Sequence, residues 1–102
     1  MFDEPRYATN AIVEKITLDL QILLWSLIDE QKHVGRELDY LQVFELWHES
    51  VNGNSIQMIV HSQERPYFIN KHLVQMINKP VSGKVWVIDS GTYATMLFPD
   101  DY

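Results

Sequence analysis

Four histidines are the side chains best suited to metal binding or acid–base chemistry in this sequence: His33, His48, His61 and His72. They fall in four separate segments, and no HExxH, HxH or Cys-His spacing connects them. The 102 residues include no cysteine, which removes disulfides, thiolate ligands and thiol nucleophiles from consideration. A metal site could assemble only through the fold, and we expect none. The histidines are interpreted as ordinary side chains on strand surfaces.

One short segment gathers polar groups of four kinds. His61, Gln63, Glu64 and Arg65 offer an imidazole, an amide, a carboxylate and a guanidinium within five positions. They form a candidate polar site for a small-ligand-binding protein or a minor enzyme. A serine nucleophile is not indicated, because Ser62 beside His61 would point to the opposite face of a strand. With no GxSxG, GxGxxG or GKS/T motif in the chain, we assign no catalytic, cofactor-binding or metal residue.

The charge balance bears on the choice of partner. Eight Lys and Arg against fourteen Asp and Glu give a net charge of −6, so we expect no nucleic-acid binding. Between Arg36 and Arg65 there are five carboxylates and no basic residue: Glu37, Asp39, Glu45, Glu49 and Glu64. They form either a solvated strand surface or an acidic face for a basic partner. An acidic face for a basic partner would suit an acidic phage-type inhibitor of a nucleic-acid enzyme.

Length and hydropathy indicate a single domain that does not associate with membranes. The amino terminus is acidic, and no run approaches 18 uninterrupted apolar residues. We expect a cytoplasmic protein with no membrane partner. Apolar residues make up 46% of the chain, and its length suits a single α+β domain over residues 1–102.

A helix is predicted over about residues 17–34. Thr17 is a suitable N-cap, Asp19 lies in the first turn, and Lys32 and His33 precede Gly35 at the end. Five apolar residues at helical spacing form one stripe that can cover a sheet: Leu20, Leu23, Leu24, Leu27 and Ile28.

The same helix carries a second apolar group. Leu18, Ile22 and Trp25 lie nearly opposite the leucine stripe at about 100° per residue. A helix on a sheet needs only one buried face, so this group must meet another part of the chain or another molecule. Leu18, Ile22 and Trp25 are therefore the candidate interaction surface.

The remaining segments read mainly as strands. Residues 7–13 suit a first strand, and residues 41–49 a second, with either a bulge near Val43-Phe44 or burial on both faces. Asn52-Gly53 predicts a tight hairpin to residues 56–62, which places Trp47 opposite Met58 and Glu45 opposite Val60.

Residues 67–77 favour a strand over a short helix, residues 78–83 a loop, and residues 85–88 and 93–98 a last hairpin. The sum is a five- or six-stranded, mainly antiparallel sheet with one main helix packed on one face. Part of one face of such a sheet stays bare, which favours association.

Five segments carry a resemblance to a known family: residues 18–29 (LDLQILLWSLID), 38–46 (LDYLQVFEL), 61–66 (HSQERP), 87–91 (VIDSG) and 95–97 (TML). As a set they resemble an uncharacterised family of small proteins from staphylococci, related Gram-positive bacteria and their phages, catalogued as domain of unknown function nine hundred and sixty. The resemblance implies a bacterial or phage-related origin and no activity. From the residues, we expect a small non-catalytic interaction module, whose partner is a second copy in a homodimer or another protein.

Overall fold

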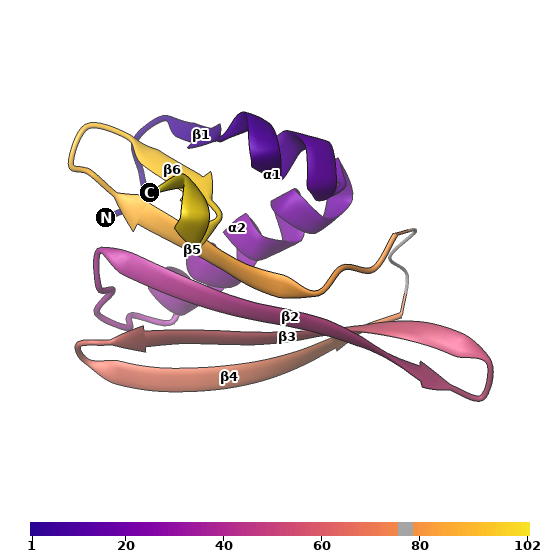
Figure 1. Cartoon of the computed structure of the whole chain (residues 1–102). Coiled ribbons are helices and arrows are strands. Elements are labelled where there is room, and N and C mark those ends of the chain that lie inside the picture. The colour runs from indigo at the N-terminus through magenta and orange to yellow at the C-terminus, as the bar shows by residue number, and fades with distance from the viewer. Residues whose placement is uncertain (76–78) are drawn as a thin grey trace.

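The computed structural model describes residues 1–75 and 79–102 (Figure 1). Nine elements follow in order: β1 (Arg6–Ala8), α1 (Asn10–Lys15), α2 (Leu18–His33), β2 (Leu41–Val51), β3 (Asn54–Glu64), β4 (Tyr67–Val74), β5 (Gly83–Asp89), β6 (Ala94–Leu97) and the 3₁₀ turn η1 (Pro99–Asp101). The predicted class is confirmed, because the fold is α+β with one main helix and a mostly antiparallel sheet.

The sheet has six strands in the order β1-β6-β5-β2-β3-β4. All neighbouring strands are antiparallel except β1 and β6, which run parallel. The short β1 and the eight-residue β4 are therefore the two edge strands. In Figure 1, β4 is the strand at the bottom of the view, and the helices lie at the top.

The core lies between α2 and one face of this sheet. Leu20, Leu24 and Ile28 of the predicted stripe are fully buried, and they pack in one cluster with apolar side chains of the central strands. In β2 the even-numbered residues Phe44 and Leu46 join the cluster, so the odd-numbered residues face away from the helices. This alternation defines an inner, helix-covered face and an outer face of the sheet.

The predicted strand over residues 7–13 is wrong in its second half, because α1 begins at Asn10. Thr9 follows β1 and caps the helix: its Oγ1 accepts a hydrogen bond from the backbone N–H of Ile12 at 3.4 Å. Ile12 and Ile16 stand four residues apart and are both buried, which is helical spacing. The β-branched pair Ile12-Val13 favours a strand by propensity, but a helix forms here because it buries Ile12 together with Ile16.

The two threonines at helix starts give a matched pair for a stability test. We expect Thr9→Ala to lower the free energy of unfolding by about 1 kcal/mol, since it removes the cap and a 3.0 Å hydrogen bond from Thr9 Oγ1 to Asp101 Oδ2. Thr17→Ala should cost only about a few tenths of a kcal/mol, because Thr17 Oγ1 has no partner among the described residues. Equilibrium urea unfolding measures both, and equal losses would contradict this account.

The long hairpin of β2 and β3 agrees with the prediction. Trp47 pairs with Met58 and Glu45 with Val60, and Asn52 and Gly53 adopt positive φ angles of 52° and 81°. Of the two alternatives for this strand, a bulge near Val43-Phe44 is not observed, because the pairing from Val43 to Val51 is unbroken. Burial on both faces explains the pattern instead: Phe44 is buried on the inner face and Val43 half-buried on the outer one.

The later strands follow the expected order. Residues 67–74 form a strand, as predicted, and β5 and β6 form the last antiparallel hairpin. The part of the predicted strand at residues 76–77 and the first residue of the predicted loop, 78, lie outside the described residues. No helix in the described ranges has the length and apolar character needed to cross a bilayer.

Candidate functional site

The inner face of β2 and β3 carries a buried polar network. Gln42, His61 and Gln63 are each at most 2% exposed. Gln42 Nε2 donates to the backbone oxygen of Asp39 at 2.9 Å and to Gln63 Oε1 at 2.8 Å. Because both amide hydrogens of Gln42 are used, its Oε1 must accept, and His61 Nε2 donates to it at 2.6 Å. His61 is therefore the Nε2–H tautomer.

Gln63 completes this network and saturates its own bonding capacity. Its Nε2 donates to the backbone oxygens of Glu37 at 3.0 Å and Pro66 at 2.6 Å. Its Oε1 accepts from Gln42 and from the backbone N–H of Asp39 at 3.0 Å. One side chain thus joins the segment before β2 to the turn between β3 and β4.

His61 sits in an aromatic sandwich. Its ring stacks on Phe44 at 4.5 Å between centroids and meets Phe68 edge-on at 5.1 Å. Burial lowers the pKa of His61 to about 3, with a smaller contribution from the nearby His72. The Nδ1 of His61 and the Nε2 of His72 are buried without a hydrogen-bond partner among the described residues. At neutral pH His61 is an uncharged structural side chain.

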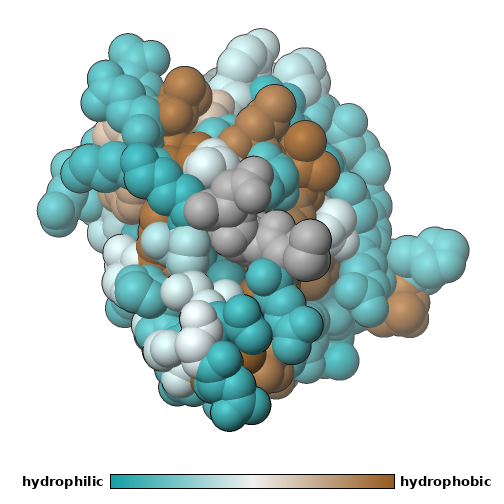
Figure 2. Space-filling view, turned by 90° about the vertical axis from the view of Figure 1, so that its right-hand side faces the viewer, coloured by the Kyte–Doolittle hydropathy of each residue, from teal (hydrophilic) through white to brown (hydrophobic). Residues whose placement is uncertain are grey.

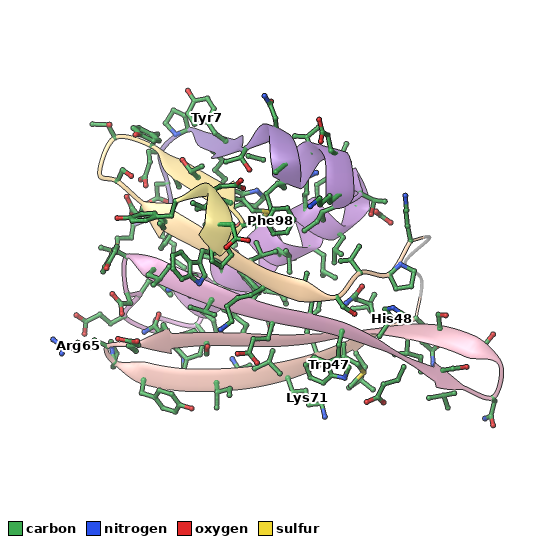
Figure 3. All side chains as sticks on the ribbon, in the orientation of Figure 1. Tyr7, Trp47, His48, Arg65, Lys71 and Phe98 are labelled. Atoms are coloured by element: carbon green, nitrogen blue, oxygen red, sulfur yellow. The ribbon has the colours of Figure 1, made fainter. Side chains whose placement is uncertain are left out.

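The structure separates the four residues of the predicted polar site. His61 and Gln63 are buried on the inner face, whereas Glu64 and Arg65 are exposed at the β3–β4 turn. Figure 3 shows Arg65 at the end of the sheet, pointing away from it. The proposal of a ligand site at these residues stays a prediction, and the buried pair belongs to the network described above.

A cavity of about 600 Å³ lies elsewhere, between α1, the start of β5 and η1. Its lining includes Ile16, Leu46 and Phe98, with Lys15 and Lys84 balanced by two aspartates, and none of the four predicted polar residues lines it. Within residues 1–75 and 79–102, no group of three or more His, Asp or Glu side chains is placed to hold a metal ion.

The predicted interaction surface lies on the outer side of α2. Leu18 is 69% exposed and Ile22 58% exposed, one helical turn apart. Trp25 is half-buried, because it packs against the core cluster and the Arg6 guanidinium lies 4.8 Å from its ring centroid. Arg6 also pairs with Asp29, so β1 covers one end of the apolar group. We call Leu18, Ile22 and Trp25 the helix face.

The short helix α1 carries a further exposed apolar side chain. Val13 of α1 is also exposed. The sequence analysis did not identify it as an exposed helix residue, because it predicted a strand over residues 7–13. Figure 2 views the end of the molecule that carries α1 and shows hydrophobic side chains gathered in its upper part among hydrophilic ones. Exposed apolar side chains thus occur on both helices.

A second apolar group lies on the outer face of β4. Tyr67, Ile69 and Leu73 are 68%, 55% and 63% exposed and alternate along the strand. Lys71 stands between Ile69 and Leu73, and its Nζ lies 5.8 Å from the ring centroid of Trp47 (Figure 3). The sequence analysis missed this group, although the spacing of two between its members was the signal for one strand face.

Comparison with known proteins agrees with this fold. A crystal structure of a protein of unknown function from Enterococcus faecalis superposes with a TM-score of 0.78 at 24% identity, covering 98% of this chain and 92% of the other. No curated protein matches the chain. The model of one family, staphylococcal protein of unknown function (DUF960), matches residues 5–101. The match spans nearly the whole sequence, as the resemblance noted above implied, and the chain belongs to the DUF960 family.

Proposed function

We propose that the protein is a non-catalytic interaction module that binds a partner protein through its helix face. The observation that carries the proposal is the exposure of Leu18 and Ile22, at 69% and 58%, on a helix whose opposite side fills the core. Exposed apolar groups of this kind, rimmed by polar residues, mark binding sites.

The helix face has the composition of an interface centre. Burying a leucine or isoleucine side chain contributes about 1.5–3 kcal/mol, so Leu18 and Ile22 together can contribute several kcal/mol to binding. Trp25 adds a half-buried aromatic ring already held in place by Arg6. Such rigid aromatic anchors are enriched among the residues that dominate binding energy.

The rim of the helix face indicates the charge of the partner. Asp19 and Glu30 are exposed on α2 and join no ion pair among the described residues, whereas Asp29 is already paired with Arg6. A complementary partner therefore combines apolar side chains with Lys or Arg, in keeping with the net charge of −6. An acidic inhibitor of a nucleic-acid enzyme, the alternative function, would also bind a partner with basic side chains.

Affinity capture with matched variants tests the proposal. The double substitution Leu18→Ser and Ile22→Ser changes two exposed side chains, so the fold and its melting temperature should stay close to wild type. We expect wild type and a Val51→Ser control on the distant hairpin to retain the same protein from a bacterial extract, and the double variant to lose it.

Washing the captured complex at high salt concentration gives a second test of the proposal. The retained protein should dissociate more readily at about 1 M salt, where the Debye length is about 3 Å. Retention that is equal in wild type and the double variant would show that the helix face is not the binding site.

A further inference from the structure

The free edge of β4 differs from the edges that proteins normally leave exposed. An edge strand presents unpaired backbone N–H and C=O groups, and it is usually short, bulged, or guarded by proline or charge. At the other edge, β1 has only three residues. In contrast, β4 has eight residues, contains neither proline nor glycine, and pairs with β3 without interruption from Tyr67 to Val74.

The one charged side chain of β4 does not guard the edge. Lys71 reaches across β3 to the ring of Trp47 on β2, two strands into the sheet. Its ammonium group therefore lies on the outer face of the sheet beside Trp47, where it does not cover the backbone groups of the edge. The backbone edge and the exposed side chains Tyr67, Ile69 and Leu73 remain available together.

We propose that two copies of this chain associate through their β4 strands, antiparallel and centred on Asn70, to form one continuous twelve-stranded sheet. The two-fold axis stands perpendicular to the sheet, so the outer faces of both copies lie on the same side. Residues directly opposite each other must then share a face, which allows only pairings of equal parity.

Among these registers, the one centred on Asn70 fits the side chains of the strand. It pairs Tyr67 with Leu73 of the second copy and Ile69 with Lys71, over seven residues of each strand. The register centred on Lys71 also spans seven residues, but it places the two ammonium groups directly opposite each other, which is destabilising. Registers further away form fewer pairs.

This association is independent of the proposed function and limits it in one respect. A two-fold interface uses the same patch on both copies, and a second such interface on the same chain closes into a tetramer only when the two axes intersect at a right angle. With β4 as the self-association surface, the helix face is left for a different protein.

Single-cysteine crosslinking tests the register, since the chain has no cysteine of its own. In the proposed dimer the Asn70 Cα atoms lie roughly 4.5–5.5 Å apart, within the range of a disulfide. The Lys71 Cα atoms lie about 8 Å apart, beyond that range. We expect Asn70→Cys to give a covalent dimer under mild oxidation, and Lys71→Cys and a Val51→Cys control to form no covalent dimer.

Charge variants test the same pairing without a covalent bond. Sedimentation should show wild type as a dimer, and Ile69→Lys as a monomer, because each new lysine faces Lys71 of the other copy. Adding Lys71→Glu to Ile69→Lys should restore the dimer by pairing opposite charges. A monomeric wild type, a Lys71→Cys crosslink as strong as that of Asn70→Cys, or a double variant that stays monomeric would each overturn the proposal.

Discussion

Replacing Gln63 with leucine is expected to lower the free energy of unfolding by roughly 3 kcal/mol, a large part of the stability of a domain this size. Leucine fills a similar volume but removes four hydrogen bonds, two donated and two accepted by the Gln63 amide. The amide of Gln42 is fully buried and would lose a partner that no solvent can replace.

Glu64→Leu is the matched control for this prediction, because Glu64 is the next residue on β3 and its side chain is exposed. Its effect should stay within about 0.5 kcal/mol. Urea unfolding followed by tryptophan fluorescence compares the two variants. Similar values for both would mean that the buried network does not contribute as its geometry indicates.

Acid should destabilise the protein between about pH 6.5 and pH 4, before most carboxylates titrate. The pKa of His61 falls from 6.5 in the unfolded chain to about 3 in the folded one, because burial disfavours the imidazolium. The unfolded state therefore binds the proton first, so this contribution to stability is complete above pH 6.5 and is lost as the pH falls toward 3. We expect a loss of roughly 3 kcal/mol between pH 6.5 and pH 4.

The substitution His61→Phe separates this effect from other titrations. It keeps an aromatic ring between Phe44 and Phe68 but removes the titrating group, so the slope of stability against pH should flatten over the same window. Asp3 acts at lower pH, since its hydrogen bond from Lys32 lowers its pKa below the ordinary 3.8. An unchanged slope in His61→Phe would assign the acid sensitivity to another group.

The main elements of the fold could be predicted because their signals are local. The leucine stripe of α2 and the Asn52-Gly53 turn each lie within a few residues, and both are confirmed. The short α1 was missed because Ile12-Val13 favours a strand when read alone. Only the long-range burial of Ile12 against the core decides for the helix, and no local pattern contains that information.

The candidate sites also differ in whether a local pattern or a long-range contact determines them. The helix face followed from angular spacing on one helix, and the structure exposes Leu18 and Ile22 as that spacing indicated. The buried network could not be predicted, because Gln42 and Gln63 lie 21 residues apart and meet only through the pairing of β2 with β3. For the same reason His61 was assigned to a polar site, although its strand turns it inward.

The parallel pairing of β1 with β6 makes completion of the sheet depend on a contact between distant parts of the chain. Arg6 pairs with Ala94, so β1 has no neighbour in the sheet until β6 is in place. Until then the buried side chains of Ile12 and Met96 lack each other's cover. Because such contacts between distant parts of the chain slow folding, we expect β1 to join the sheet late.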